Sequence, residues 1–228
     1  MIIDVITLFP DIFKGFLGES IIRIAQEKGL VKINLHNLRD FTPDKHQKVD
    51  DRPYGGGPGM VLMAEPVFRI MEHLNTPERN SFHRVLLTPH GQIYTQKLAQ
   101  ELAQSKGLIL LCGHYEGFDE RIRQTIKFDE ISIGDYILSG GEVAVLVLID
   151  SVVRLIPGVL GNPESKGNHD TVQLDVPQYT RPRSIRGKVI PEVLLSGHHQ
   201  KIKQWRLNEA LKRKRTCPDV ISGSEEKL

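Results

Sequence analysis

Short apolar segments alternate with segments of helical spacing along the first 160 residues, and this alternation constrains the fold more than any other feature. Short apolar runs bounded by turn residues are typical of buried strands. A strand that is apolar on both faces needs helices on both faces. The sequence therefore predicts an α/β domain over residues 1–160, with a mostly parallel sheet between helical layers. We expect strands at residues 2–9, 30–38, 84–89, 107–113 and 129–134, and helices at residues 10–30, 64–74, 94–105, 118–126 and 140–155.

The rest of the chain has a different character. Residues 161–178 show little periodicity and are expected to form a flexible linker. Residues 179–228 are expected to form a small basic helical domain, with Ser196 as the N-cap of an amphipathic helix.

Positive charge is concentrated in this last part. From residue 181 to residue 215, eleven Lys and Arg oppose only two Glu, a balance of +9 in a chain of net charge +2. A solvated helix face is the ordinary explanation of a charge run. A balance this large favours binding to a polyanion such as a nucleic acid.

Several classes of protein do not fit the sequence. No apolar run approaches the ~20 residues of a membrane span, and the first ten residues lack the basic segment of a secretory signal. Cys112 and Cys217 form no CxxC pair, and Cys112 is expected in the core. No P-loop, dinucleotide fingerprint or zinc-binding pattern is present, so no metal site is expected. We expect a reduced cytoplasmic protein that does not bind a membrane.

Three glycine-bearing loops follow expected strands, at residues 86–91, 111–117 and 132–142. Ligands in open α/β sheets bind at the carboxyl ends of the strands. Ordinary turns explain any one such loop. Three loops at one edge predict a cradle for a small molecule.

Long motifs resemble a known family. They are "RDFTPDKHQKVDDRPYGGGPGM", "LCGHYEGFDERI", "SIGDYILSGGE", "LIDSVVRLIPGVLG", "PQYTRP" and "VLLSGHHQKIKQWR". Together they closely resemble the bacterial tRNA (guanine-N1)-methyltransferases, a family of the knotted SPOUT methyltransferases. The resemblance implies a deep trefoil knot, S-adenosyl-methionine as methyl donor, and guanine 37 of tRNA, just 3′ of the anticodon, as acceptor. It also implies a homodimer with active sites between the subunits, and it makes a requirement for Mg²⁺ plausible.

The resemblance also carries the family's functional residues onto this chain. It implies donor binding by Leu87, Thr88, Pro89, Gly113, Tyr115, Glu116, Ile133, Gly134, Asp135, Tyr136, Ile137, Leu138, Gly140 and Gly141. It implies tRNA binding by Asp50, Arg52, Tyr54, Gly55, Gly59, Ser196, His198 and Arg206.

The implied catalytic pair is Asp170 and Arg154. A carboxylate near guanine N1 is suited to remove its proton, and a guanidinium can stabilise the charge that then develops on O6. The sequence around Asp170 departs from the family pattern, which leaves Asp175 as a rival base. Arg154 lies one helical turn after Asp150, so an internal ion pair is its alternative role.

Two other functions remain open at this point. One is an RNA methyltransferase of the same fold that acts on ribosomal RNA. The other is a non-catalytic RNA-binding protein that uses the basic end alone, but such a protein would not need the three glycine-bearing loops.

Overall fold

The computed structural model describes residues 1–160 and 176–216. The chain divides into two compact units, Met1–Lys166 and Gly167–Leu228. No helix in the described ranges is long and apolar enough to cross a bilayer.

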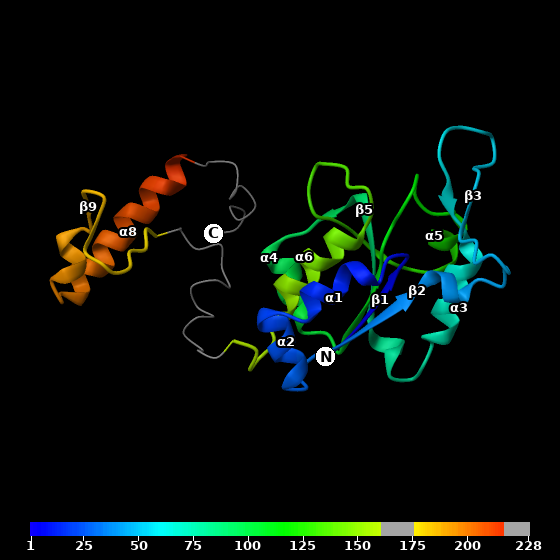
Figure 1. Ribbon diagram of the computed structural model, residues 1–228, viewed down its shortest axis with the longest axis horizontal. Coiled ribbons are helices and arrows are strands. Elements are labelled where there is room, and N and C mark those ends of the chain that lie inside the picture. The colour runs from blue at the N-terminus through cyan, green and yellow to red at the C-terminus, as the bar shows by residue number, and fades with distance from the viewer. Residues whose placement is uncertain (161–175, 217–228) are drawn as a thin grey trace, which may run out of the picture. The chain divides into compact units, whose positions relative to one another are not determined.

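The first unit is built on a parallel sheet of five strands in the order β2-β1-β6-β5-β7 (Figure 1). The prediction of a mostly parallel sheet is therefore confirmed. All five strands coincide with segments expected to be strands. They are β1 (Ile2–Thr7), β2 (Lys32–Asn37), β5 (His83–Ile93), β6 (Gly107–Leu111) and β7 (Asp129–Ser132).

Helices cover both faces of this sheet, as expected for strands that are apolar on both sides (Figure 1). Leu108 and Leu110 of β6 face one core, and Ile109 and Leu111 face the other. The first face carries α1 (Asp11–Leu17), α2 (Ser20–Glu27), α4 (Gln96–Ala103) and α6 (Glu142–Val153), and the second carries α3 (Ala64–His73), α5 (Arg121–Thr125) and the short 3₁₀ helix η1 (Leu38–Phe41).

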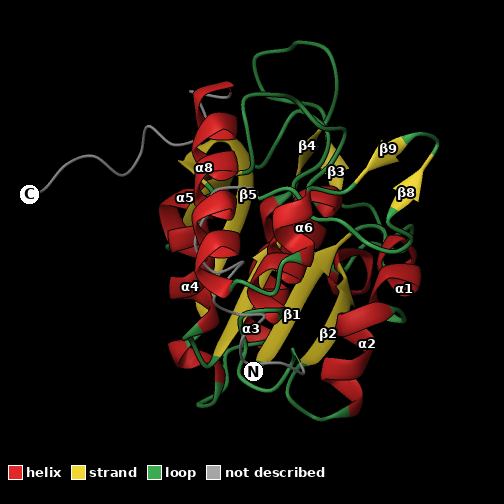
Figure 2. Ribbon diagram, turned by 90° about the vertical axis from the view of Figure 1, so that its left-hand side faces the viewer, coloured by secondary structure: helices red, strands yellow, loops and turns green. Residues whose placement is uncertain are grey.

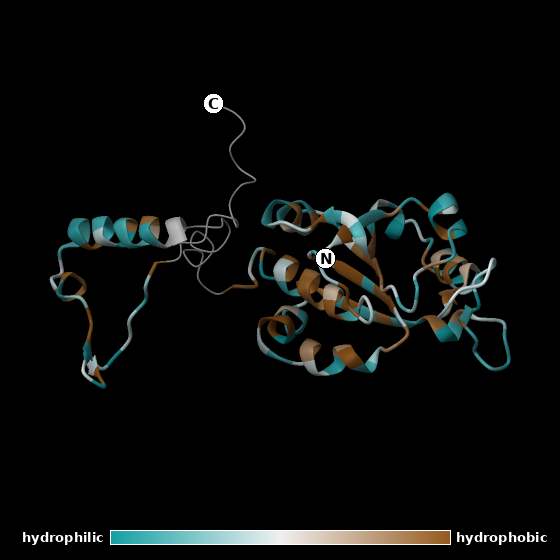
Figure 3. Cartoon of the chain, turned by 90° about the horizontal axis from the view of Figure 1, so that it is seen from above, coloured by the Kyte–Doolittle hydropathy of each residue, from teal (hydrophilic) through white to brown (hydrophobic). Residues whose placement is uncertain are grey.

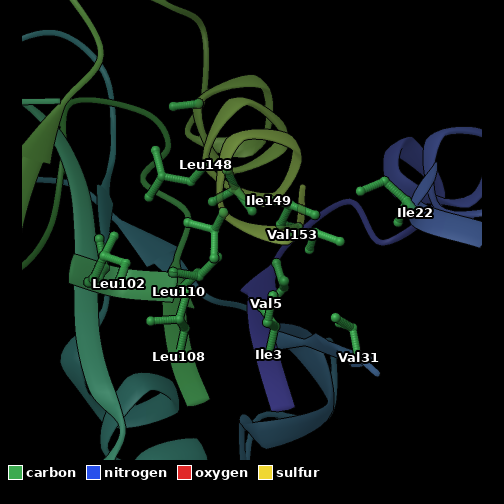
Figure 4. Packing of buried hydrophobic residues seen from close by; sticks show 14 of the residues in the cluster. Ile3, Val5, Ile22, Val31, Leu102, Leu108, Leu110, Leu148, Ile149 and Val153 are labelled. Carbon is green, nitrogen blue, oxygen red and sulfur yellow. The ribbon is translucent and has the colours of Figure 1, made fainter. Parts of the chain in front are cut away.

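The helix α6 contributes most to the first core. Leu148, Ile149 and Val153 point from it toward Ile3 and Leu110 on the strands (Figure 4). Figure 2 shows α6 lying across the face of the sheet, and Figure 3 shows apolar strands between more polar outer elements. Because each buried aliphatic side chain contributes about 1.5–3 kcal/mol, this packing fixes α6 and the loop before it.

The single helix expected over residues 10–30 is wrong. The structure has two helices in this stretch, because α1 ends at Leu17 and the N–H of its capping residue Gly18 donates to Lys14 O at 3.2 Å. Glu19 is extended and Ser20 has a φ of 51°, so the helical path is interrupted. Two glycines at positions 15 and 18 weaken the helix in this stretch.

The strand expected at residues 84–89 is longer than predicted. Leu87 and Gln92 both pair with Ile131, so residues 88–91 form a bulge within β5 rather than a loop after it. Gly91 lies against the backbone of the neighbouring strand, where a Cβ would meet Glu130 C at 2.5 Å. The end of the bulge is therefore packed tightly against β7.

The glycine-rich segment joins two short antiparallel strands. Asp50 pairs with Leu62, and Asp51 with Val61, so residues 52–60 form the connecting loop. These strands, β3 (Asp50–Asp51) and β4 (Val61–Leu62), were not predicted from the sequence.

Residues 176–216, the described part of the second unit, contain a small hairpin and one long helix. The hairpin strands β8 (Ser184–Ile185) and β9 (Lys188–Val189) were not predicted, and η3 (Glu192–Leu195) precedes α8 (His199–Thr216). Ser196 lies three residues before α8, where its Oγ accepts from His198 N at 3.2 Å, so it is not the residue that directly precedes the helix. The prediction of an amphipathic helix is wrong, because the apolar positions of α8 point in several directions around its axis.

Candidate functional site

A pocket of about 450 Å³ lies at the carboxyl ends of β5, β6 and β7. Three segments form its wall, namely the β5 bulge, the loop after β6 and the loop that leads from β7 to α6. These segments contain the three glycine-bearing loops that the sequence singled out. The pocket is lined by Leu87, Thr88, Pro89, His90, Gly113, His114, Tyr115, Glu116, Gly117, Phe118, Arg123, Ile131, Ser132, Ile133, Gly134, Tyr136, Ile137, Leu138, Ser139, Gly140, Gly141 and Ala144.

The structure brings together all but one of the residues expected to bind the methyl donor. Asp135 is the exception and does not line the pocket. His114 lines the pocket but was not among the expected donor-binding residues. Its place between two expected residues, Gly113 and Tyr115, was the available signal.

Backbone lies close to backbone where the last loop meets the loop after β6. Gly141 N donates to Gly113 O at 2.7 Å, and His114 bridges to Gly140. A Cβ on Gly141 would meet Gly113 N at 2.7 Å, and a Cβ on Gly140 would meet Glu142 Oε2 at 2.5 Å. At Gly141 the obstructing atoms are backbone, so only glycine fits there, whereas at Gly140 they belong to the side chains of Glu142 and His114.

The chemistry of the pocket suits a nucleoside-sized ligand. Its backbone is exposed at glycines, and the rings of Tyr115 and Tyr136 are partly exposed at its edge. These residues therefore fit the S-adenosyl-methionine expected from the resemblance. In the described ranges, no three His, Cys, Asp or Glu side chains are placed to hold a metal ion.

The glycine-rich loop contacts the wall of this pocket at Glu116 and Gly117. Glu116 N donates to Met60 O at 2.9 Å, and Leu62 N donates to Gly117 O at 2.9 Å. Gly59 has a φ of 79°, and a Cβ on it would lie 2.5 Å from Glu116 Cγ. The loop also borders a second hollow, which is lined by Arg52, Pro53, Gly56, Gly57, Gly59 and Met60.

The residues expected to contact tRNA in this loop are accessible. Arg52 and Gly55 are exposed, Tyr54 is fully exposed, and Asp50 is half-buried. The sequence-predicted side chains of the second unit, namely Ser196, His198 and Arg206, are also exposed. The Trp205 ring is half-buried 6.3 Å from the Tyr179 ring, which fits a packing role.

Arg154 is not at the pocket of its own chain. It follows the last residue of α6, whereas the pocket adjoins the first residue, Glu142. At about 1.5 Å per residue the two ends lie about 18 Å apart. The ion pair considered for Arg154 is not formed, since its only contact with Asp150 is a backbone bond from Arg154 N to Asp150 O at 3.3 Å. The expected base Asp170 and its rival Asp175 lie outside the described residues.

Comparison with known proteins supplies an independent line of observation. A model of the family described as tRNA (Guanine-1)-methyltransferase TrmD matches residues 1–222. Curated relatives named tRNA (guanine-N(1)-)-methyltransferase are similar over most of the chain. The one from Anoxybacillus flavithermus is 54% identical over 215 residues, which cover 93% of this chain and 88% of the relative. The one from Carboxydothermus hydrogenoformans is 54% identical over 213 residues (92% and 83%), and the one from Halalkalibacterium halodurans is 50% identical over 226 residues (98% and 92%).

Proposed function

This chain belongs to the tRNA (guanine-1)-methyltransferase family, and from that membership we propose that it methylates N1 of guanine 37 in tRNA with S-adenosyl-methionine as donor. The observation that carries the proposal is the pocket of three glycine-bearing segments at one sheet edge. A family match over nearly the whole chain supports the reaction, and the pocket supports the donor.

The donor site is proposed to use backbone more than side chains. Bound S-adenosyl-methionine supplies an electrophilic sulfonium methyl group. The protein then has to hold that methyl group in line with the acceptor nitrogen. Because the methyl group is already electrophilic, positioning lowers the barrier more than further activation would. The close contacts of Gly113, Gly140 and Gly141 support such a cradle, because an added Cβ at each of these positions would lie within 3.1 Å of a neighbouring segment.

Proton removal from guanine N1 is proposed for Asp170, with Asp175 as the rival base. The N1 lone pair is not free until its proton leaves, so a carboxylate within hydrogen-bond reach is needed. Arg154 is proposed to stabilise the negative charge that develops on O6. Its guanidinium forms no ion pair with any side chain in the part of the chain that the structure describes, which leaves it available for this role.

The separation of Arg154 from its own pocket supports a homodimer with shared active sites. The outer stripe of α6 presents Val143 and Val147, which are 52% and 42% exposed. Phe9 and Ile12 are exposed on the neighbouring segment. Apolar side chains gathered on one element are typical of an interface between protein subunits. We place the second copy on this face, where its Arg154 reaches the first copy's pocket.

The tRNA is proposed to meet two parts of the chain. The glycine-rich loop presents Arg52 and Tyr54 beside the donor pocket, and the basic end supplies charge for the phosphates. The basic end is proposed to act as a tRNA-binding helical domain. Because tRNA occurs in the cytoplasm, we place the enzyme there.

A trefoil knot is part of the proposal. The chain leaves β7 at the sheet edge and returns past β5 to the loop after β6, where Gly140 bridges to His114. This return supports a threaded path into α6. A need for Mg²⁺ is tested by adding a chelator to the methylation assay.

The experiment that tests the function is methyl transfer to tRNA transcripts. Purified protein with labelled S-adenosyl-methionine and Mg²⁺ is expected to label a transcript with guanine at position 37, at N1. A transcript with adenine at that position is the matched control and is expected to stay unlabelled. Equal labelling of the two transcripts, or labelling of ribosomal RNA alone, rejects the proposal.

A further inference from the structure

Glu142 is a buried carboxylate behind the wall of the donor pocket. It is the first residue of α6 and is only 3% exposed, yet it does not line the pocket. Its Oε1 accepts from Thr7 Oγ1 at 2.8 Å, and Thr7 Oγ1 accepts from Phe9 N at 2.9 Å. The hydrogen bonds therefore run in one direction, from the end of β1 to Glu142.

The second carboxylate oxygen faces His114. Nδ1 of His114 lies 4.0 Å from Glu142 Oε2, and in the described ranges this buried nitrogen has no hydrogen-bond partner. Gly140 has no side chain to fill the space, and a Cβ there would lie 2.5 Å from both atoms. At 4.0 Å the two atoms are an ion-pair contact and not a hydrogen bond, so the imidazole must turn for Nδ1–H to donate to Glu142.

A buried carboxylate needs donors on both oxygens. An ionised group taken out of water is strongly destabilising unless it is paired or hydrogen-bonded. Thr7 donates a hydrogen bond to Glu142 Oε1, and the partial positive charge at the amino end of α6 stabilises the carboxylate further. Burial raises the pKa of the adjacent Cys112 thiol well above its usual range, and the charge of Glu142 raises it further, so this thiol stays neutral. The one basic side chain within ion-pair distance, among the described residues, is His114.

A carboxylate that accepts a hydrogen bond from one ring nitrogen of a histidine fixes whether the other nitrogen donates or accepts. When Nδ1–H donates to a carboxylate, the neutral imidazole keeps a lone pair on Nε2. Phe9 and Tyr115 restrict the ring further, with centroids 5.1 and 4.9 Å from that of His114. The side chain of His114 is 21% exposed although Nδ1 is buried, so its exposed edge lies away from Nδ1.

We infer that His114 is a further donor-binding residue that accepts a hydrogen bond from an O–H or N–H group of the methyl donor. Glu142 is its positioning residue, because it selects the tautomer with Nε2 free to accept. This inference rests on the proposed donor site and adds a residue to it. Ligands of the required class carry ribose hydroxyls or amino groups, as S-adenosyl-methionine does.

The test compares the parent protein with Glu142→Gln. The amide keeps the size of the side chain and an oxygen for Thr7, but turns an N–H toward His114 Nδ1. That nitrogen must then accept, so Nε2 carries the proton and no longer accepts. Loss of one such hydrogen bond is expected to weaken S-adenosyl-methionine binding about tenfold in a calorimetric titration.

The tautomer is read directly by ¹⁵N NMR of the histidine rings, without any enzymatic turnover. The parent is expected to show His114 protonated on Nδ1, and Glu142→Gln to show it protonated on Nε2. His83→Gln is the matched control, since His83 also faces a carboxylate, with its Nδ1 at 3.1 Å from Asp129 Oδ2, but does not line the pocket. This control is expected to bind the donor as the parent does.

The outcomes separate this inference from the proposed function. A parent that binds no S-adenosyl-methionine rejects the proposed function. A parent that binds it but carries the His114 proton on Nε2 rejects the inference alone. So does equal donor affinity in the parent and Glu142→Gln. If Glu142→Gln does not fold, the tautomer of His114 in the parent still tests the inference, since a proton on Nε2 rejects it and a proton on Nδ1 supports it.

Discussion

Gly141 N donates a hydrogen bond of 2.7 Å to Gly113 O, and this bond joins the loop before α6 to the loop after β6. Two walls of the pocket proposed to bind the donor are therefore joined by a backbone hydrogen bond. The contact is so close that a Cβ on Gly141 would lie 2.9 Å from Cys112 Cα. The apolar packing of α6 holds this junction from behind.

Replacement of Gly141 by alanine is expected to open the pocket. A Cβ contact below 3 Å with backbone forces the two loops apart, so donor affinity should fall at least tenfold in calorimetry. Gly15→Ala is the control, because Gly15 is exposed in α1 and has nothing within 4 Å of its Cβ position. The control should bind normally and gain about 0.5–1 kcal/mol of stability. Parent-like affinity in Gly141→Ala contradicts this account of the pocket.

Gly59 and Gly56 form a matched pair for the glycine-rich loop. Both have a φ of 79°, so alanine strains the backbone equally at the two positions. Only Gly59 has a neighbour, since its Cβ would lie 2.5 Å from Glu116 Cγ and Oε1, whereas Gly56 has nothing within 4 Å. We expect Gly59→Ala to displace Glu116 and to weaken donor binding severalfold, and Gly56→Ala to leave it unchanged. Equal donor affinities in the two variants would show that the Glu116 contact is unimportant.

Asp4 makes the stability of the protein depend on pH. Burial alone would raise the pKa of Asp4, but hydrogen bonds from His36, Arg79 and Asn34, together with the charge of Arg79, outweigh it and lower the pKa to about 2. A carboxyl whose pKa is lower in the folded state stabilises the protein above its unfolded pKa. That stabilisation is lost as the pH falls from about 4 to about 2, and it amounts to about 2 kcal/mol.

Urea unfolding at a series of pH values measures this loss. Asp4→Asn is expected to be less stable at pH 7 and to show a flatter profile between pH 4 and pH 2. Asp11→Asn is the control, because Asp11 forms only an exposed ion pair with Lys14. If the free energy of unfolding of Asp4→Asn falls with pH as steeply as that of the parent, Asp4 is not the group responsible for the loss of stability.

Arg154→Ala is expected to lose turnover without losing the donor. A group that stabilises developing charge contributes about 2.7–4 kcal/mol to the barrier, so single-turnover methylation should slow about 100- to 1000-fold. Donor affinity should not change, because the proposed role of Arg154 is to stabilise charge on the guanine O6 and Arg154 does not line the donor pocket of its own chain. Arg69→Ala removes an exposed arginine that is paired with Glu65 and should leave the rate unchanged. An unaltered rate in Arg154→Ala would remove the residue from the mechanism.

The sequence predicted the parallel sheet and the place of the pocket at its carboxyl edge, because both depend on local patterns. Apolar runs such as that of β6 need cover on both faces, and the carboxyl ends of parallel strands share one edge. The glycines at positions 113, 140 and 141 lie in short loops directly beside these strands, so their convergence followed from the topology.

Features that depend on contacts between distant segments could not be predicted in this way. The pairing of Thr7 with Glu142 joins residues 135 positions apart, and no spacing rule indicates it. The bulge in β5 forms against its neighbour β7, and the sequence, which carries no sign of that pairing, predicts a loop at residues 86–91 instead. The break between α1 and α2 was missed because helical spacing continues through Gly18.

The proposed contribution of Arg154 across a subunit interface can be tested by mixing two defective variants, at a donor concentration too low for Gly141→Ala to bind the donor well. Arg154→Ala keeps its pocket but lacks the arginine, and Gly141→Ala keeps the arginine but has a damaged pocket. In a mixed dimer, the pocket of the first chain meets the arginine of the second, and one intact site is restored. Random exchange should therefore recover about a quarter of the parent's activity.

A site contained within one chain gives the opposite result. Each chain of the mixed dimer would then carry one defect at its own site, and mixing would recover nothing. Subunit exchange is verified by mass spectrometry of differently tagged chains, so that lack of recovery cannot come from lack of mixing. Because α6 places its two ends about 18 Å apart, we expect recovery, and its absence in verified mixed dimers would reject the shared active site.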